Sequence, residues 1–274
     1  MAAAGKDDKD DEDHKDTGDD GERRSTAGRR TVDWGHLGAA SAEFAEAEAS
    51  GSAEGLRERK KRQTRQMLTD TATAMFMARG FDAVRVAEIA EACGVSEKTV
   101  FNYFPTKESL ILDRWATLPT ALTSALADPR TPPPSAALSV LADELKALTS
   151  WMAQQPDFPE ARRLVGRFGE LIRSTPSLRA HQSEATEHLI ADTAAVLATR
   201  TGTDPDAPEP LAAAHALLGL WPVQYAALRR HLPTARSPKA LADAVAADVS
   251  RAARVIEHGL AEWTTGSAAG PALP

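Results

Sequence analysis

The stretch CGVSEKTVFNYFPTKESL, residues 93–110, decides the fold of this chain. It joins Gly94, which can take the positive φ of a tight turn, to Ser96, which is suited to cap a helix. Three aromatic residues follow within four positions, and Pro105 then ends the helix that starts after Ser96. The stretch therefore predicts a short helix over residues 97–104, directly after a turn.

A second short helix precedes the turn, over residues 86–93. Val86, Ile89 and Ala90 lie at helical spacing on its apolar face, and Ala90 is small enough for a close helix crossing. Two short helices joined by a glycine-containing turn form the helix-turn-helix, whose second helix enters the major groove of DNA. The face of this second helix that is turned away from the core carries amine, hydroxyl, amide and aromatic groups suited to base edges, from Lys98, Thr99, Phe101 and Asn102.

The rest of the chain has the apolar spacing of helices. A first helix runs from residue 56 to Gly80, which ends it as a C-terminal cap. Pro105 opens a fourth helix, and Pro119 ends or kinks it. No segment alternates as a strand does, so we expect an all-α protein. Proline-rich joints separate further helices near residues 135–155, 159–174, 177–200, 209–232 and 238–263.

The composition excludes several classes of protein. With 274 residues, 42% of them hydrophobic, the chain is long enough for one large domain or two small ones. No apolar run approaches the roughly 18 residues of a membrane span, and the N-terminus is acidic, unlike a signal peptide. The single cysteine, Cys93, excludes an internal disulfide framework and fits a reducing compartment. We therefore expect a cytoplasmic protein.

Charge is divided unevenly along the chain. Residues 1–50 carry 14 acidic and 7 basic residues, and the opening run GKDDKDDEDHKDTGDD contains no aromatic residue for a core. We expect a disordered acidic tail over residues 1–50. The segment RERKKRQTR, residues 57–65, has six basic residues and one acid. The tail can be a passive solubilising segment, or it can compete with DNA phosphates for this basic segment, and the sequence leaves both open.

These features together resemble the TetR (tetracycline-repressor-like) family of bacterial one-component regulators. The resemblance is carried by TRQMLTDTATAMFMARGF, residues 64–81, and by VAEIAEACGVSEKTVFNYFPTKESL, residues 86–110. It implies a three-helix helix-turn-helix domain over residues 51–115, with helix four linking from about residue 106. It also implies a multi-helix effector-binding and dimerisation domain over residues 116–274.

The resemblance assigns DNA-contacting roles residue by residue. Thr64 matches a phosphate-contacting hydroxyl, whereas Thr99 and Tyr103 match positions that contact the DNA backbone or bases. Lys107 matches a phosphate-holding lysine at the start of helix four, where the helix N-terminus adds its own attraction for phosphate. The basic residues 57–62 match an N-terminal extension that reaches phosphates or the adjacent minor groove.

Two positions depart from the family pattern. Phe101 stands where the family usually has tyrosine, so a hydroxyl–phosphate bond is lost. Arg85 stands where a Ser or Thr normally caps the second helix, a loss of about 1 kcal/mol, although its side chain can instead reach a phosphate. The predicted DNA-contacting residues are Arg57, Arg59, Lys60, Lys61, Arg62, Thr64, Arg65, Arg85, Ser96, Glu97, Lys98, Thr99, Phe101, Asn102, Tyr103 and Lys107.

In the family, the C-terminal helices form the dimer interface and surround the effector. The last two predicted helices carry apolar stripes, which include Leu218 and Leu228 in one helix and Val249 and Ile256 in the other. These stripes predict a homodimer through the last two helices, although they can also pack within a single chain. The predicted effector-pocket residues, each of which can also be ordinary core, are Trp115, Trp151, Phe168, His188, Trp221 and Tyr225.

The sequence thus predicts a homodimeric, ligand-responsive transcriptional regulator that binds a palindromic double-stranded DNA operator. We expect a repressor that a small-molecule effector releases. The alternative is an architectural DNA-binding protein without an effector. No metal-ligand spacing, Gly-rich phosphate loop or nucleophile elbow occurs, so we expect no enzyme activity, catalytic residue, cofactor, metal or membrane partner.

Overall fold

The computed structural model describes residues 53–204 and 206–264, and within these ranges the chain forms helices and no strand. The all-α prediction is confirmed. The predicted acidic tail, residues 1–50, lies outside the described residues. The elements are α2 (Ala53–Arg79), α3 (Val86–Ala92), α4 (Glu97–Tyr103), α5 (Ser109–Leu112), η3 (Asp113–Trp115), α6 (Leu118–Ala127), α7 (Pro133–Gln154), α8 (Phe158–Ser174), α9 (Pro176–Thr201), α10 (Pro208–Leu218), α11 (Leu220–His231) and α12 (Pro238–Thr264).

The helix-turn-helix lies where the sequence places it, with α3 and α4 each one residue shorter than predicted. Gly94 has a φ of 66°, a backbone conformation that residues with a Cβ rarely adopt, so the turn requires glycine there. Ser96 caps α4, because its Oγ accepts a hydrogen bond of 3.1 Å from the backbone N–H of Thr99. Local sequence chemistry is therefore sufficient to build this turn and to start the helix after it.

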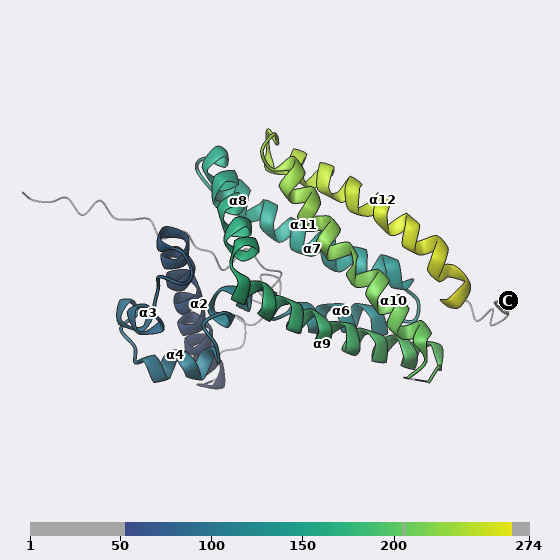
Figure 1. Ribbon diagram of the computed structural model, residues 1–274, viewed down its shortest axis with the longest axis horizontal. Coiled ribbons are helices and arrows are strands. Elements are labelled where there is room, and N and C mark those ends of the chain that lie inside the picture. Colours follow the sequence, from purple (N-terminus) through teal and green to yellow (C-terminus); the bar gives the residue numbers. More distant parts are fainter. Residues whose placement is uncertain (1–52, 205, 265–274) are drawn as a thin grey trace, which may run out of the picture. The chain divides into compact units, whose positions relative to one another are not determined.

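α2, α3 and α4 lie next to one another (Figure 1), and a hydrophobic cluster holds them together. Phe76 of α2 and Val100 of α4 are completely buried in it, and so is Phe104 just after α4. Phe168 of α8 and Leu178 of α9 belong to the same cluster. The helices that follow the helix-turn-helix thus share a core with it, which provides a physical path between the two regions.

The predicted loss of a cap at Arg85 is partly offset by Glu88. Arg85 is the residue before α3, and its guanidinium makes no capping hydrogen bond. The Glu88 carboxylate instead accepts a hydrogen bond of 2.8 Å from the backbone N–H of Arg85 and another of 2.9 Å from the Arg79 guanidinium. These bonds lower the pKa of Glu88, the backbone bond contributing most. The start of α3 is therefore fixed by its third residue.

The single fourth helix predicted from Pro105 is wrong. The chain forms a four-residue α5, then η3, and then α6, in which Pro119 occupies the second position. Thr106 and Ser109 satisfy each other's backbone N–H groups through their side-chain oxygens, at 3.2 Å and 3.1 Å. Proline suits the first turn of a helix as well as its end, so Pro119 marks the start of α6, which the sequence reading missed.

The predicted helix over residues 209–232 is two helices, α10 and α11, divided at Gly219. Pro222 has no backbone N–H to donate to the carbonyl of Leu218, so the division falls where the helical ladder is weakest. The expectation that no apolar run approaches a membrane span does not hold for residues 208–231, which are apolar and long enough, by composition, to cross a membrane. They instead contribute Leu217, Leu220 and other buried residues to the core of the helical bundle, as core helices of non-membrane proteins also do.

The apolar stripe of the last helix packs within the chain. Leu241 and Val245 are completely buried, and Val249 is 3% exposed, all in the core of the bundle. The prediction that this stripe forms a seam between two chains is therefore wrong for these residues. α11 and α12 lie side by side (Figure 1), and Asp248 joins them by accepting hydrogen bonds from Arg230 at 3.0 Å and His231 at 2.9 Å.

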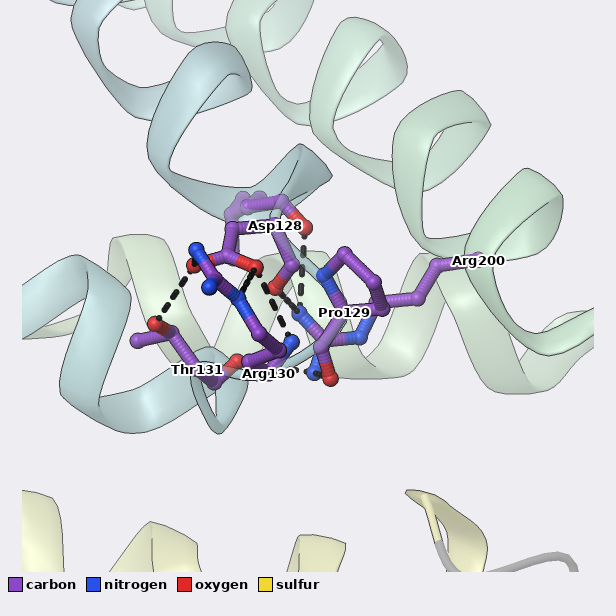
Figure 2. A network of polar contacts seen from close by, with 6 residues as sticks. Asp128, Pro129, Arg130, Thr131 and Arg200 are labelled. Carbon is purple, nitrogen blue, oxygen red and sulfur yellow. Dashed lines mark hydrogen bonds and ion pairs between the residues drawn. The ribbon is translucent and has the colours of Figure 1, made fainter.

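A single arginine fixes the loop between α6 and α7. The Arg200 guanidinium, from the end of α9, donates to the backbone carbonyls of Asp128 at 2.9 Å and Thr131 at 2.7 Å (Figure 2). It also reaches the carbonyls of Leu126 at 3.1 Å and Pro129 at 3.3 Å. Because the last carbonyls of a helix lack partners within it, Arg200 stabilises the whole connection.

Candidate DNA-binding surface and ligand cavity

The outer face of α4 is open to solvent. Glu97, Lys98 and Asn102 are exposed, and Phe101 is 45% exposed although it is a large apolar residue. Thr99 is half-buried, and its hydroxyl lies 2.8 Å from the hydroxyl of Ser96. Val100 is buried, so the helix has one face in the core and one free. This surface has the shape and the donor groups that a recognition helix needs.

The start of α2 carries the basic segment found in the sequence. Arg57, Arg59, Lys60 and Lys61 are exposed on this helix. Their charges cover slightly more than one helical turn and therefore point in several directions, so only part of the set can face one DNA backbone. Within this basic segment the chain is a regular helix, as predicted from residue 56 onward.

Arg65 has a different role from the exposed arginines on the same helix. Its Nε donates to Asp113 at 2.8 Å, its Nη2 forms an ion pair with the same carboxylate, and its Nη1 donates to the backbone carbonyl of Tyr103 at 3.2 Å. The guanidinium also lies 4.7 Å from the ring centre of Phe104. The Asp113 hydrogen bond raises the pKa of Arg65. Arg65 thus holds the end of α4 against η3, and three of its five N–H donors are engaged there.

Lys107 is half-buried rather than extended into solvent. Its ammonium lies 4.4 Å from the ring centre of Phe81 and 5.6 Å from that of Phe76. The helix that follows has only four residues, and the first of its N–H groups, that of Ser109, already donates to the Thr106 hydroxyl. The expected attraction of phosphate by this helix N-terminus is therefore not supported, and the lysine charge itself remains.

The remaining predicted contacts surround the same region. Arg85 is exposed before α3, Ser96 is exposed before α4, and Thr64, Arg62 and Tyr103 are half-buried. Tyr103 is neither fully core nor fully free, which suits a ring that packs while its hydroxyl reaches outward.

A cavity of about 540 Å³ lies between η3, α7, α8, α11 and the start of α9. Apolar side chains dominate its wall, among them Trp115, Leu148 and Phe168. Two glycines of α8 also line it, and a Cβ placed at Gly169 meets no atom within 4 Å. An apolar hollow with a few polar groups is the usual form of a small-molecule site.

The polar groups of this cavity include a half-buried acid. Glu144 of α7 accepts a hydrogen bond of 3.0 Å from the indole N–H of Trp221, and burial raises the pKa of Glu144 to about 7. Burial, followed by the charge of Glu144, raises the pKa of Tyr225 above its ordinary value, so its hydroxyl stays protonated. Gln224, which is 3% exposed, lies beside them in the wall. One side of the cavity thus presents hydrogen-bonding groups, of which Glu144 is only partly ionised near pH 7.

A second hollow, of about 860 Å³, lies between η3, α6, α9 and α11. Trp115, Gln182, Tyr225 and Arg229 line both hollows. These four side chains therefore form the wall between the two spaces.

Four of the six predicted pocket residues line these spaces. Phe168 lines the first, Trp221 lines the second, and Trp115 and Tyr225 line both. Trp151 does not, because it is 2% exposed within the core of the bundle. His188 lies on the exposed face of α9 and lines neither space.

Sequence reasoning missed the charged residues of the cavity, Arg114 and Glu144. Arg114 lies in η3, where helix four was expected to continue, so its direction was not evident. Glu144 occurs in the apolar run LSVLADELKAL, and an acid at such a position was the only available signal. Within residues 53–204 and 206–264, no three His, Cys, Asp or Glu side chains gather as metal ligands.

Two family models match the chain. One, described as bacterial regulatory proteins of the tetR family, matches residues 68–113, which run from α2 to η3. The other, described as the MftR C-terminal domain, matches residues 145–261, from α7 to α12. The two matches thus include both the helix-turn-helix and most of the helices that form the cavity.

Individual proteins are also similar. The HTH-type transcriptional regulator TcmR of Streptomyces glaucescens is 30% identical over 152 residues, which are 56% of this chain and 66% of that protein. A TetR-family regulator from Streptomyces coelicolor is 24% identical, with a TM-score of 0.39, over 71% of this chain and 94% of that one. A second Streptomyces coelicolor regulator of the family is 17% identical, with a TM-score of 0.37, over 74% and 87% of the two chains.

Proposed function

Because the chain belongs to the TetR family of bacterial regulatory proteins, we propose that it is a cytoplasmic repressor. It binds a palindromic double-stranded DNA operator as a homodimer, and a small-molecule effector releases it. The observation that carries this proposal is the free face of α4, where Lys98, Phe101 and Asn102 are exposed directly after the Gly94 turn.

In this proposal α4 lies in the major groove. Lys98 and Asn102 read base edges, because an amine or an amide can form hydrogen bonds that distinguish one base pair from another. Phe101 offers an apolar contact to thymine methyl groups. The exposed basic residues at the start of α2, together with Lys107, bind phosphates and set affinity rather than specificity.

The homodimer forms through the outward face of the last helices. Since Leu241, Val245 and Val249 are buried within one chain, the interface has to use side chains that remain free. Val255 of α12 is 78% exposed, and Leu211 of α10 is 48% exposed. Apolar side chains left in water at these positions favour a partner surface, and a two-fold dimer matches the symmetry of a palindromic operator.

The effector occupies the cavity of about 540 Å³. Its wall includes Trp115 of η3 and Phe168 of α8, and Phe168 also belongs to the hydrophobic cluster of α2, α3 and α4. A ligand that displaces Phe168 therefore alters the packing of the DNA-reading helices, which is how differential binding can shift the protein between two arrangements. An architectural protein without an effector has no need for such a space.

Selection of bound sequences from random DNA duplexes tests the proposal. We expect enrichment of one palindromic sequence, protection of both half-sites in footprinting, and loss of preference at one position in Lys98→Ala. DNA binding without enrichment of any sequence would support the architectural alternative. No DNA binding at physiological salt would refute the proposal.

A further inference from the structure

We propose that the cavity described above takes an apolar organic anion, whose acidic group is bound by Arg114. This names the chemical class of the effector and so rests on the proposed function. The ligand has a hydrocarbon or aromatic body that fills the apolar space and one acidic group, such as a carboxylate.

The first argument is the unsatisfied guanidinium of Arg114. Arg114 lines the cavity, and its Nη1 is buried without a hydrogen-bond partner among the described residues. Its Nε donates to the carbonyl of Ile111 at 3.3 Å, and its Nη2 reaches the Thr73 hydroxyl only at 3.5 Å. A buried donor without a partner is costly, and arginine donors favour a planar anion such as a carboxylate. Nη1 has no accessible surface in this arrangement, so an acid in the cavity supplies the missing acceptor once the guanidinium turns toward it.

Nearby carboxylates do not take this role. The charges of Asp70 and Asp113 favour the protonated form of Arg114, but burial has the larger effect and lowers its pKa to about 10. Asp113 is already bound by Arg65 through both carboxylate oxygens, and Asp70 accepts a hydrogen bond of 2.9 Å from Gln66. Arg114 therefore stays charged at neutral pH and keeps a donor for a ligand.

The balance of charge in the wall also favours an anion. Besides Arg114, the arginines Arg173, Arg179 and Arg229 line the cavity, against two acids. One acid, Glu170, forms an ion pair with Arg173. The other, Glu144, is held partly protonated by burial near neutral pH. A cationic ligand would thus meet an excess of like charge, whereas an anion is attracted.

The surroundings of Arg114 indicate what the rest of the ligand is. The guanidinium lies 4.2 Å from the ring centre of Phe168, so its flat face is covered and its edge is the part left for an anion. Leu145, Leu148 and Val165 line the same space. A wholly polar anion such as phosphate would leave these side chains facing trapped water, whereas an apolar body buries them.

A displacement experiment that involves no DNA tests this inference. The neutral fluorophore N-phenyl-1-naphthylamine reports occupancy of an apolar cavity, and it is displaced by decanoate, 1-decanol or decylammonium, all below their micelle concentrations. The three competitors share one alkyl chain and differ in charge. We expect decanoate to compete about tenfold better than 1-decanol, and decylammonium to compete worst, because a charge-assisted hydrogen bond to Arg114 is worth at least this factor.

Three variants locate the effect. Arg114→Gln should remove the preference for decanoate over 1-decanol and leave displacement by 1-decanol within about twofold. Gly169→Leu places a side chain in the cavity and should weaken binding of the fluorophore itself. Arg163→Gln is the matched control, because Arg163 is an exposed arginine of α8 that pairs with Glu160 and lines neither hollow. It should behave as the wild type.

Equal competition by decanoate and decylammonium in the wild type would overturn the inference, even if Arg114→Gln failed to fold. So would an unchanged decanoate preference in a folded Arg114→Gln protein. The proposed function is tested separately, because a protein that selects decanoate but binds no operator refutes only the regulatory role. A protein that binds its operator and shows no anion preference refutes only the ligand class.

Discussion

Replacing Glu144 with glutamine should stabilise the protein, and more so at high pH. Glu144 is the acid in the cavity wall that accepts a hydrogen bond from Trp221 at 3.0 Å. Glutamine has nearly the same shape and keeps an oxygen for this bond, but it cannot ionise. The substitution therefore removes the buried charge and leaves the packing unchanged.

The magnitude follows from the pKa of Glu144, which burial raises from 4.5 to about 7. Between these two values the folded protein holds a proton that the unfolded chain releases, so stability falls as the pH rises through this window. The resulting penalty is about 1 kcal/mol at pH 5 and about 3 kcal/mol at pH 8, where ionisation is nearly complete in both states. Tyr225 does not contribute, because its pKa is raised above the ordinary value of 10.

Urea unfolding followed by circular dichroism, at one protein concentration and at pH 5 and pH 8, measures the effect. The gain from Glu144→Gln should be about 2 kcal/mol larger at pH 8 than at pH 5. Asp143→Asn is the matched control, since Asp143 is an exposed acid on the same helix and should give no comparable difference. Equal effects of Glu144→Gln at the two pH values, or destabilisation at pH 8, would refute the argument that Glu144 is buried as a neutral acid.

Three further predictions concern DNA and assembly. Lys107→Ala should weaken binding to all DNA sequences alike and reduce the salt dependence of the affinity, whereas Lys98→Ala should relax the base preference at one operator position. The reverse pattern in binding titrations would contradict the assigned roles. Val255→Asp should give a folded monomer that does not bind a palindromic site, whereas Val249→Asp, at a position 3% exposed, should lower the unfolding midpoint. Sedimentation and thermal melts distinguish the two effects. A dimeric Val255→Asp protein would exclude the outward face of α12 as the dimer interface. Deletion of residues 1–50 should raise affinity for random DNA at low salt if the acidic tail competes for the basic segment, and unchanged affinity would leave it a passive tail.

Part of the candidate DNA-binding surface could be predicted from the sequence, because it depends on short-range chemistry. Gly94, Ser96 and Pro105 fix the turn, the start of α4 and its end within a dozen residues. The spacing of Val100 and Phe104 then decides which face of α4 is buried, and Lys98 and Asn102 are left exposed as a consequence. The turn, the cap and the buried face of α4 therefore depend little on the fold of the rest of the chain.

Other parts required the tertiary structure. Arg65 belongs to the same basic segment as Arg59 and Lys60, and no local pattern separates it from them. It turns inward because Asp113, 48 residues later, lies within hydrogen-bond distance once α2 and η3 pack together. The apolar stripe of α12 likewise fits a partner chain or the bundle equally well, and only the position of the bundle core decides that Val249 faces inward.

The sequence by itself therefore determined α2, α3, the turn and the outward face of α4, because caps, glycines, prolines and helical periodicity act over a few residues. The tertiary structure alone decided which charges are free and which are buried. It brought Arg114 and Glu144, which are 30 residues apart in the sequence, to the wall of one cavity. It also left Arg114 Nη1 without a hydrogen-bond partner among the described residues. Burial and pairing depend on contacts between distant segments, and the free energy of a charge depends on them more than on its neighbours in the chain.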